Sequence, residues 1–319
     1  IYTRWARRSL ELWTELFERI GQPQLFQNTG VLWTAPADDP RSAQTAATLE
    51  KCGVAFERYP PAELAVHYPQ FRFSEERIGI FEPGSGVLLA RRAVQAVVEE
   101  AVRNGVDYFR EAALAPVNGT VHTTSGHSLL AGAFVYACGP WLPKIFPALL
   151  AGRIRPTRQE VFYFGAPAGD RRFTAPAMPA WIDFSDARGP YTLPDVESRG
   201  LKLGFDRHGP AFDPDSGDRV ATGIEEARAF LAERFPALSG APLVESRVCQ
   251  YENTSTGDFL IDQHPDFPNV WLVGGGSGHG FKHGPMVGEY VTGRMDGRIA
   301  AESRFSLATK SSEEERAVY

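Results

Sequence analysis

The chain has 319 residues, of which 43% are hydrophobic and 23% are charged, and its net charge is −6. This length allows one large hydrophobic core or two closely associated ones. The negative net charge and the absence of a run of basic residues in the sequence argue against a nucleic-acid partner. No stretch approaches the roughly 18–20 apolar residues of a membrane span. The only cysteines, Cys52, Cys138 and Cys249, lie far apart, which fits a reducing compartment, so we expect a cytoplasmic protein.

The first fifty residues predict a helix, a strand and a second helix. Residues 2–20 carry apolar side chains at helical spacing with charges between them. Residues 29–35 read as a strand. The segment 39–52 predicts a helix that starts near Asp39 or Ser42 and stops before Gly53.

The next part of the chain predicts a strand, a turn, a helix and another strand over residues 78–109. The helix covers about 90–103 and ends at Asn104-Gly105, a typical C-terminal stop. Residues 132–141 form a nearly continuous apolar run, which is typical of a strand buried on both faces in a parallel sheet.

The second half alternates between a sheet-rich region and a strand–turn–helix unit. Residues 153–245 are rich in proline and aromatics and predict mostly strands, plus a helix at 223–235. Residues 269–295 predict a strand, a glycine turn and a helix. The tail from 308 onward is polar, and we expect it to be poorly ordered. The pattern indicates an α/β fold with two interleaved parts.

The glycine-rich stretch "GGGSGHGFKHGP" at 274–285 resembles a phosphate-binding loop but matches neither common signature. A Walker A loop is excluded because Phe281 precedes Lys282 and His283 follows it. The spacing of the glycines also fails the G-x-G-x-x-G pattern. The stretch still follows an apolar strand and precedes a helix, so its backbone N–H groups favour an anion.

Two other interpretations of this stretch stay open. It is also typical of a tight turn in which glycines supply positive φ angles. His279 and His283 are four residues apart and could form a metal pair, but no third ligand is apparent nearby, so we expect no metal.

Several motifs together resemble one enzyme family across essentially the whole chain. These motifs are "YTRWARRSLELW" (2–13), "FEPGSGVL" (81–88), "YACGPW" (136–141), "GLKLGF" (200–205), "CQYENTSTGDFLIDQHP" (249–265) and "GGGSGHGFK" (274–282). They are similar to the flavin-dependent amine oxidases of the monomeric sarcosine oxidase and N-methyl-tryptophan oxidase group, in the D-amino-acid-oxidase-like superfamily.

The resemblance implies an FAD cofactor and a two-part fold. A Rossmann-like FAD-binding domain is expected from residues 1–24, 84–151 and 246–302. A mixed-sheet substrate domain is expected from 25–83 and 152–245, followed by a tail at 303–319.

The resemblance also implies which residues contact FAD. Cys249 falls where the family joins FAD to the protein through a thioether at the flavin 8-methyl group. The loop from Gly276 to Lys282 falls where the family's backbone approaches the flavin ring. The complete set implied to bind the cofactor is Cys249, Gly276, Ser277, Gly278, His279, Gly280, Phe281, Lys282, Cys138, Gly139 and Trp141. Read without the resemblance, the thiols of Cys52 and Cys138 are inert core groups.

Four further residues are implied at the reacting centre. Lys282 helps to bind the substrate carboxylate in the family, and Tyr251 and Tyr191 match tyrosines that line the substrate cavity. Lys202 matches a lysine beside the flavin that activates oxygen, because a cation stabilises the superoxide formed there. Without the resemblance, Lys202 reads as a solvated strand lysine.

The sequence departs from the family at Asp206 and at the start of the chain. The family often has a histidine at the position of Asp206, so an acid there predicts a changed amine preference. The family also begins with a strand–GxGxxG–helix unit of at least about 30 residues. No such motif occurs here and the chain begins with Ile1, so we expect that this unit precedes Ile1 in the complete protein and that FAD binding is incomplete without it.

The sequence therefore predicts a flavin-dependent oxidase that converts a secondary α-amino acid, N-methylated or cyclic, to an imine, with O2 reduced to H2O2. Its partners are expected to be this small amine and O2, in a monomer or homodimer without nucleic acid or membrane. Two alternatives stay open. One is an FAD-dependent dehydrogenase or tailoring oxidase acting on a larger amine, and the other is a non-catalytic remnant or subunit of the same fold.

Overall fold

The computed structural model describes residues 1–183 and 185–313, and it divides into two compact units. Unit 1 comprises Ile1–Ala90, Gln159–Gly209 and Gly217–Cys249. Unit 2 comprises Arg91–Arg158, Pro210–Ser216 and Gln250–Tyr319. The chain thus passes between the units several times, and we describe each unit by itself. The assignment of FAD and substrate binding to the predicted domains stays a prediction.

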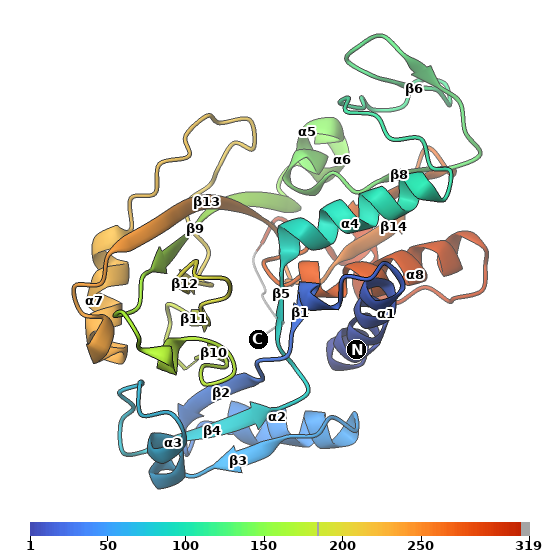
Figure 1. Ribbon diagram of the computed structural model, residues 1–319. Helices are drawn as coiled ribbons and strands as arrows, with labels where there is room; N and C mark the ends of the chain where they lie inside the picture. Colours follow the sequence, from blue (N-terminus) through green and yellow to red (C-terminus); the bar gives the residue numbers. More distant parts are fainter. Residues whose placement is uncertain (184, 314–319) are drawn as a thin grey trace. The chain divides into compact units, whose positions relative to one another are not determined.

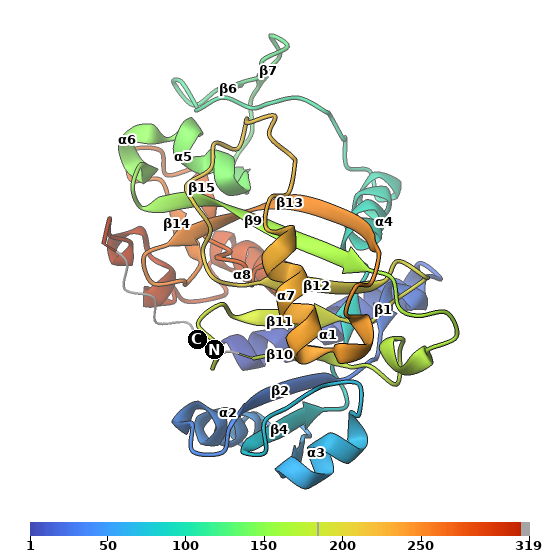
Figure 2. The same ribbon diagram turned by 90° about the vertical axis from the view of Figure 1, so that its left-hand side faces the viewer.

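Unit 1 is built on a mixed sheet with helices packed against it (Figures 1 and 2). The strands of the 8-stranded sheet run in the order β13-β9-β12-β11-β10-β2-β4-β3. Their bounds are β2 (Val31–Pro36), β3 (Glu57–Tyr59), β4 (Arg77–Glu82), β9 (Ile154–Phe164), β10 (Ala180–Ile182), β11 (Pro190–Leu193), β12 (Leu201–Phe205) and β13 (Leu243–Thr254). The short strands β1 (Phe26–Gln27) and β5 (Val87–Leu88) pair separately. The helices are α1 (Tyr2–Arg19), α2 (Pro40–Lys51), α3 (Pro61–His67) and α7 (Ile224–Arg234).

Local sequence signals account for the helices of this unit. In α1 the buried side chains are Trp5, Ser9, Trp13 and Phe17, which lie at helical spacing. Helix α2 begins at the predicted cap, where the Asp39 side chain accepts from the backbone N–H of Arg41. Its end is followed by Gly53 at a φ of +66°. These two predicted helices are confirmed.

The main core of unit 1 lies between α7 and the sheet, and Figure 2 shows α7 in front of these strands. Leu201 and Leu203 of β12 are fully buried there against Phe230 of α7 and the indole ring of Trp181. Alternation along β12 therefore places Lys202 and Gly204 on the opposite face of the sheet. This face carries the first part of the candidate site.

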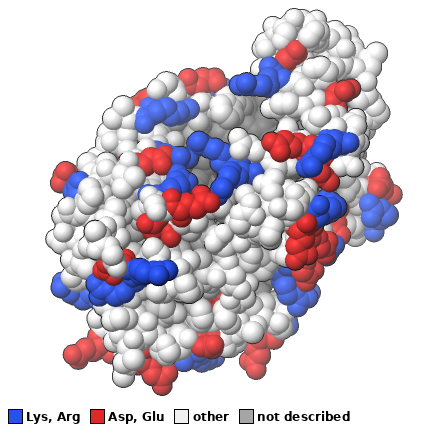
Figure 3. Space-filling model, in the orientation of Figure 1, with Lys and Arg blue, Asp and Glu red and all other residues white. Residues whose placement is uncertain are grey.

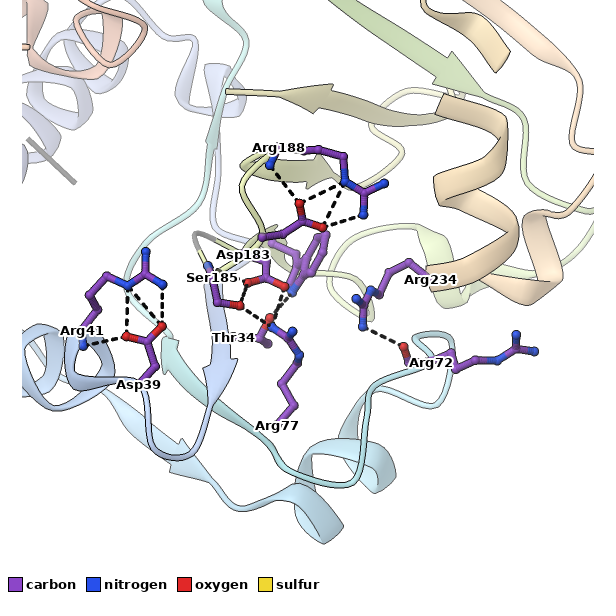
Figure 4. Close-up of polar contacts among 11 residues, drawn as sticks. Thr34, Asp39, Arg41, Arg72, Arg77, Asp183, Ser185, Arg188 and Arg234 are labelled. Carbon is purple, nitrogen blue, oxygen red and sulfur yellow. Dashed lines mark hydrogen bonds and ion pairs between the residues drawn. The ribbon is translucent and has the colours of Figure 1, made fainter. Parts of the chain in front are cut away.

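A buried ion pair connects the strands at one side of unit 1 (Figure 4). Arg77 donates from Nη1 to Asp183 Oδ2 at 2.5 Å, and the Asp183 side chain is fully buried. The other Asp183 oxygen accepts from the backbone N–H of Ser185 at 3.0 Å. Nearby, Trp181 donates to the hydroxyl of Thr34 at 2.9 Å. Because the Asp183 charge is paired and hydrogen-bonded, its burial is tolerated.

Unit 2 contains a small mixed sheet with helices at its ends. The 3-stranded sheet has the order β14-β15-β8, formed by β8 (Phe134–Tyr136), β14 (Leu260–Gln263) and β15 (Val270–Gly274). Strand β15 is parallel to β8 and antiparallel to β14. Other elements are α4 (Ala90–Arg103), α5 (Leu142–Ile145), α6 (Pro147–Leu150), α8 (Gly284–Met295) and the hairpin of β6 (Val121–His122) with β7 (Ser128–Leu129). The predicted bounds of α4 are confirmed.

Three sequence predictions in unit 2 are wrong in part. The run 132–141 yields only the three residues of β8, and Val135 is 45% exposed because β8 lies at the edge of its sheet. Residues 106–109 form no strand, since within the described chain no strand pairs with them, and Tyr108 and Phe109 are exposed. Lys310 lies in the tail expected to be disordered, yet it is buried and donates to the backbone oxygen of Arg304 at 2.6 Å.

The distribution of surface charge and the character of the helices are the features that concern the predicted partners. Figure 3 shows Lys and Arg side chains interspersed with Asp and Glu on the face in view. Within the part of the chain that the structure describes, no helix has both the length and the apolar character needed to cross a bilayer.

Candidate functional site

In unit 1, the structure brings the predicted residues Lys202 and Tyr191 together. Strands β11 and β12 are antiparallel, with Tyr191 opposite Gly204. The ring of Tyr191 lies over Gly204, because a Cβ atom there would approach its ring and hydroxyl to 2.5 Å. The ammonium of Lys202 lies 5.5 Å from the centre of the same ring. Glycine at 204 therefore allows the tyrosine to lie flat beside the lysine, where a cation–π contact stabilises the charge.

The electrostatic environment of Lys202 is unusual for a lysine. Burial lowers the pKa of its ammonium, Cys249 raises it, and the guanidinium groups of Arg199 and Arg247 lower it. Burial is the largest of these effects, so the pKa of Lys202 lies below its ordinary value. The alternative prediction, that Lys202 is a solvated lysine on a strand, is wrong, because the Lys202 ammonium is largely removed from water.

Cys249, on β13, belongs to the same electrostatic group. Burial raises the pKa of its thiol, while Lys202, Arg247 and Arg219 act in the opposite direction. At neutral pH the side chain is thus a thiol with three cations that favour its ionisation. The cysteine is not disulfide-bonded.

Asp206 follows β12 directly and belongs to the same unit. Its backbone N–H donates to the carbonyl of Gly189 at 2.8 Å. This contact joins the end of β12 to the turn before β11, so Asp206 has a fixed position at the strand end that follows Lys202.

In unit 2, the glycine loop and Tyr251 form the second part of the site. The loop leaves β15 at Gly274, and Gly278 has a φ of +86°. A Cβ atom on Gly278 would lie 2.5 Å from the ring of Tyr251, which β13 supplies. Tyr251 thus packs directly on the loop, and its predicted place in the substrate cavity stays a prediction. Only glycine satisfies both the φ angle and the close approach.

The remaining loop residues are held by backbone contacts. Ser277 is buried, and its hydroxyl donates to the carbonyl of Gly275 at 3.1 Å. Lys282 donates to the carbonyl of His279 at 3.3 Å, and Phe281 is 40% exposed. The loop is thereby a fixed structure that ends in a lysine.

The two histidines of the loop are buried next to each other. A ring nitrogen of His279, Nε2, lies 2.9 Å from the carbonyl oxygen of Gly257 and donates to it, so this nitrogen is used within the fold. Burial, together with Lys282 and His279, lowers the pKa of His283 to about 2. Both observations indicate that the His279 and His283 side chains pack within the protein and stabilise the conformation of the loop.

Glu252 is a site residue that the sequence did not reveal. Its Oε1 accepts from the backbone N–H of Gly276 at 3.2 Å. Its Oε2 is buried and has no hydrogen-bond partner within the described residues. Burial raises the pKa of this carboxyl, and the N–H groups of Gly276 and Gly275 lower it. The only sequence signal was an acid between Tyr251 and Asn253 in a strand that leads into the core.

The predicted segment 138–141 lies at the end of β8. Gly139 has a φ of +54°, and a Cβ on it would lie 4.0 Å from Glu252 Oε2. Burial and the nearby Glu252 raise the pKa of the Cys138 thiol. Trp141 donates from its indole N–H to Asp215 at 2.7 Å. Cys138 and Gly139 thus border the same space as Glu252, whereas the polar atom of Trp141 is directed to Asp215.

This arrangement fits a dinucleotide cofactor. Gly139 and Gly274 follow two neighbouring parallel strands, β8 and β15, and the carboxyl edge of parallel strands is where dinucleotides bind. A side chain at Gly274 would fill the space between Leu142 and Glu252, since its Cβ would lie 2.4 Å and 3.0 Å from them. The orphaned oxygen of Glu252 borders this space and requires a partner.

The comparison with family models decides the assignment. The family described as FAD dependent oxidoreductase (DAO) matches residues 1–294. The chain belongs to this family. The expected FAD cofactor and the α/β fold class follow from this membership and are confirmed.

Individual relatives agree with the family. Monomeric sarcosine oxidase of Bacillus sp. (strain B-0618) is 31% identical over 305 residues, which cover 91% of this chain and 76% of that protein. N-methyl-L-tryptophan oxidase of Salmonella heidelberg (strain SL476) is 28% identical over 297 residues, covering 90% and 77%. The family resemblance predicted from the motifs is therefore confirmed.

Solved structures of other proteins share the fold. L-proline dehydrogenase from P. horikoshii superimposes with a TM-score of 0.79 at 20% identity, covering 95% of this chain and 82% of that one. Iminodiacetate oxidase from Chelativorans sp. BNC1 gives 0.77 at 20% identity, covering 96% and 82%. At such identities the likeness establishes the fold.

Proposed function

We propose that this FAD-dependent amine oxidoreductase converts a secondary α-amino acid, N-methylated or cyclic, to the imine. The amine loses two electrons and two protons, and O2 takes up both pairs to become H2O2. Bound FAD supplies the two-electron carrier between the amine and O2. The family and its sarcosine and N-methyltryptophan oxidase relatives support the amine as substrate.

Residues of three chain segments are proposed to hold FAD. In unit 2 they are the glycine loop, with Gly276, Gly278 and Lys282, and the segment around Gly139. In unit 1, Cys249 is proposed to form a thioether with the flavin 8-methyl group. Forming this C–S bond breaks the S–H bond and one methyl C–H bond, so two protons are released and the two electrons would pass through FAD to O2. The reacting form of the cysteine is the thiolate, which the charges of Lys202, Arg247 and Arg219 favour against burial.

Substrate binding is proposed to depend on a cation and two aromatic rings. The Lys282 ammonium would pair with the substrate carboxylate, which orients the amine toward the flavin. Tyr251 and Tyr191 would form walls of the cavity. Each of them already packs against a glycine of its own unit, Gly278 and Gly204, so their rings are held in place without substrate.

The environment of Lys202 is the observation that supports O2 as the electron acceptor. Its ammonium is largely buried, lies on the ring of Tyr191 and is electrostatically coupled to Cys249. A desolvated cation stabilises an anion formed next to it far more than a hydrated one does. Lys202 is thus suited to stabilise superoxide when the reduced cofactor meets O2.

Replacement of this lysine tests the proposal. We expect Lys202→Met to slow reoxidation of the reduced flavin by O2 about 100-fold or more, in the range of losing one preorganised charge. Reduction of the flavin by the amine should change far less. Stopped-flow absorbance measures both rates, with Lys51→Met, at the exposed last residue of α2, as the matched control. An unchanged reoxidation rate would show that Lys202 does not activate oxygen.

Asp206 gives specific support to a second candidate, a dehydrogenase or tailoring oxidase on a larger amine. The acid is fixed at the end of β12, the strand that carries Lys202, and an anion there favours a more basic amine. Amine oxidation without peroxide would favour the dehydrogenase. The cytoplasmic location and the monomeric or dimeric state stay predictions.

A further inference from the structure

Glu252 combines a fixed carboxyl oxygen with one that has no partner. It lies in β13 next to Tyr251, and its Oε1 is held by the N–H of Gly276 at 3.2 Å. Its Oε2 is removed from solvent and makes no hydrogen bond within residues 1–183 and 185–313. Buried polar atoms are almost always hydrogen-bonded, so we expect this oxygen to gain a partner in the working protein.

The surroundings of Oε2 show where that partner would lie. A Cβ on Gly274 would come within 3.0 Å of Oε2, and one on Gly139 within 4.0 Å. Gly274 ends β15 and Gly139 follows shortly after β8, and these two parallel strands are direct neighbours in the sheet. Oε2 therefore lies at the carboxyl edge of a parallel pair, where dinucleotides bind, and next to Gly139, where a Cβ would meet no atom nearer than Oε2 itself.

The protonation of Glu252 determines what it can offer. Burial is the largest influence and raises the pKa of the carboxyl, which favours the neutral acid. Because Oε1 accepts from Gly276, the proton is placed on Oε2. A protonated carboxyl has one O–H donor. FAD carries phosphate, hydroxyl and carbonyl oxygens that accept such a bond.

We propose that Glu252, as a neutral carboxylic acid, binds FAD by donating a hydrogen bond from Oε2 to an acceptor atom of the cofactor. Through Oε1 the same side chain holds the glycine loop, so one residue would connect the cofactor to the loop. This inference concerns how FAD is held and is independent of the amine that is oxidised.

FAD affinity in two variants gives the first test, with the intact protein in a Cys249→Ala background so that binding is reversible. Glu252→Gln keeps both a donor and the acceptor for Gly276, and we expect its FAD dissociation constant within about twofold of the parent. Glu252→Ala should weaken binding about tenfold, as expected for one lost hydrogen bond. Quenching of flavin fluorescence measures both constants.

A matched control separates cofactor contact from general damage to unit 2. Asp262→Asn changes an acid of β14 that accepts from Ser306 and Leu307, away from the loop contacts of Glu252. It should lower the thermal unfolding temperature yet leave FAD affinity unchanged. Loss of affinity in Asp262→Asn equal to that in Glu252→Ala would overturn the proposal.

Infrared spectroscopy tests the neutral state directly. The difference spectrum between FAD-bound and FAD-free protein should contain the carbonyl band of a protonated carboxylic acid, and Glu252→Gln should lack it. Absence of this band in the parent protein would overturn the proposal. So would tenfold weaker FAD binding by Glu252→Gln, because it would mean that the negative charge is required.

Discussion

At the scale of single residues, burial and neighbouring charges oppose each other around Lys202 and Cys249. Each group stabilises the charged form of the other, while burial favours both neutral forms. This balance makes the protonation of both groups sensitive to pH.

The lowered pKa of Lys202 predicts how oxygen reactivity depends on pH. Below that pKa the side chain is a cation, and as the pH rises through it the charge is lost. We therefore expect the rate of flavin reoxidation by O2 to fall at high pH, starting below the ordinary lysine pKa. Rapid mixing of reduced protein with O2 at a series of pH values measures this rate. In Lys202→Arg the charge persists and the decline should vanish; a parent rate that rises with pH would contradict the role.

Cys249 gives a second prediction at this scale. Acid precipitation of the parent protein should leave the yellow flavin in the pellet, and Cys249→Ala should release it to the supernatant. Cys52→Ala serves as the control, because Cys52 lies at the end of α2, and it should keep the colour bound. If the parent releases all its flavin, no thioether is present.

The sequence revealed these residues unequally. The motifs pointed to Lys202, Tyr191 and Cys249, but the contact of Lys202 with Tyr191 depends on the pairing of two strands and on Gly204. Glu252 escaped prediction because its importance lies in its surroundings. Gly276 donates to one of its oxygens, and no described residue donates to the other.

At the scale of elements, predictions held where the signal is local. The cap of α2, the stop after α4 and the strand–loop–helix from β15 to α8 depend on neighbours in the sequence. Residues 106–109 and the tail depend on distant partners. The segment 106–109 has no pairing strand in the described chain. Lys310 is buried, and its ammonium donates to the backbone oxygen of Arg304.

The glycine loop yields a prediction about an element. Gly278→Ala should destabilise the protein by about 2 kcal/mol or more, because alanine at positive φ is strained and its Cβ meets the Tyr251 ring. FAD affinity should also fall. Gly288→Ala, in α8 where a Cβ meets nothing within 4 Å, should instead stabilise by roughly 0.5–1 kcal/mol. Urea unfolding measures both changes; equal effects would contradict the account of the loop.

At the scale of the whole molecule, a single element continues from one unit into the other. The strand β13 carries Cys249 in unit 1 and Tyr251 and Glu252 in unit 2. The interleaved helical and sheet-rich regions of the sequence indicated domains built from separate chain segments. A chain with such domains passes from one unit to the other more than once. The composition could not supply the boundaries, since compactness is set by contacts between distant segments.

The central claim is that this family member passes electrons from a secondary amine to O2. The most direct measurement supplies N-methyl and cyclic secondary amino acids with O2 as the sole acceptor, and determines peroxide and imine together. We predict that at least one of these amines yields peroxide and imine in equal amounts. Amine oxidation with an artificial acceptor but no peroxide with O2 would contradict the oxidase and favour the dehydrogenase.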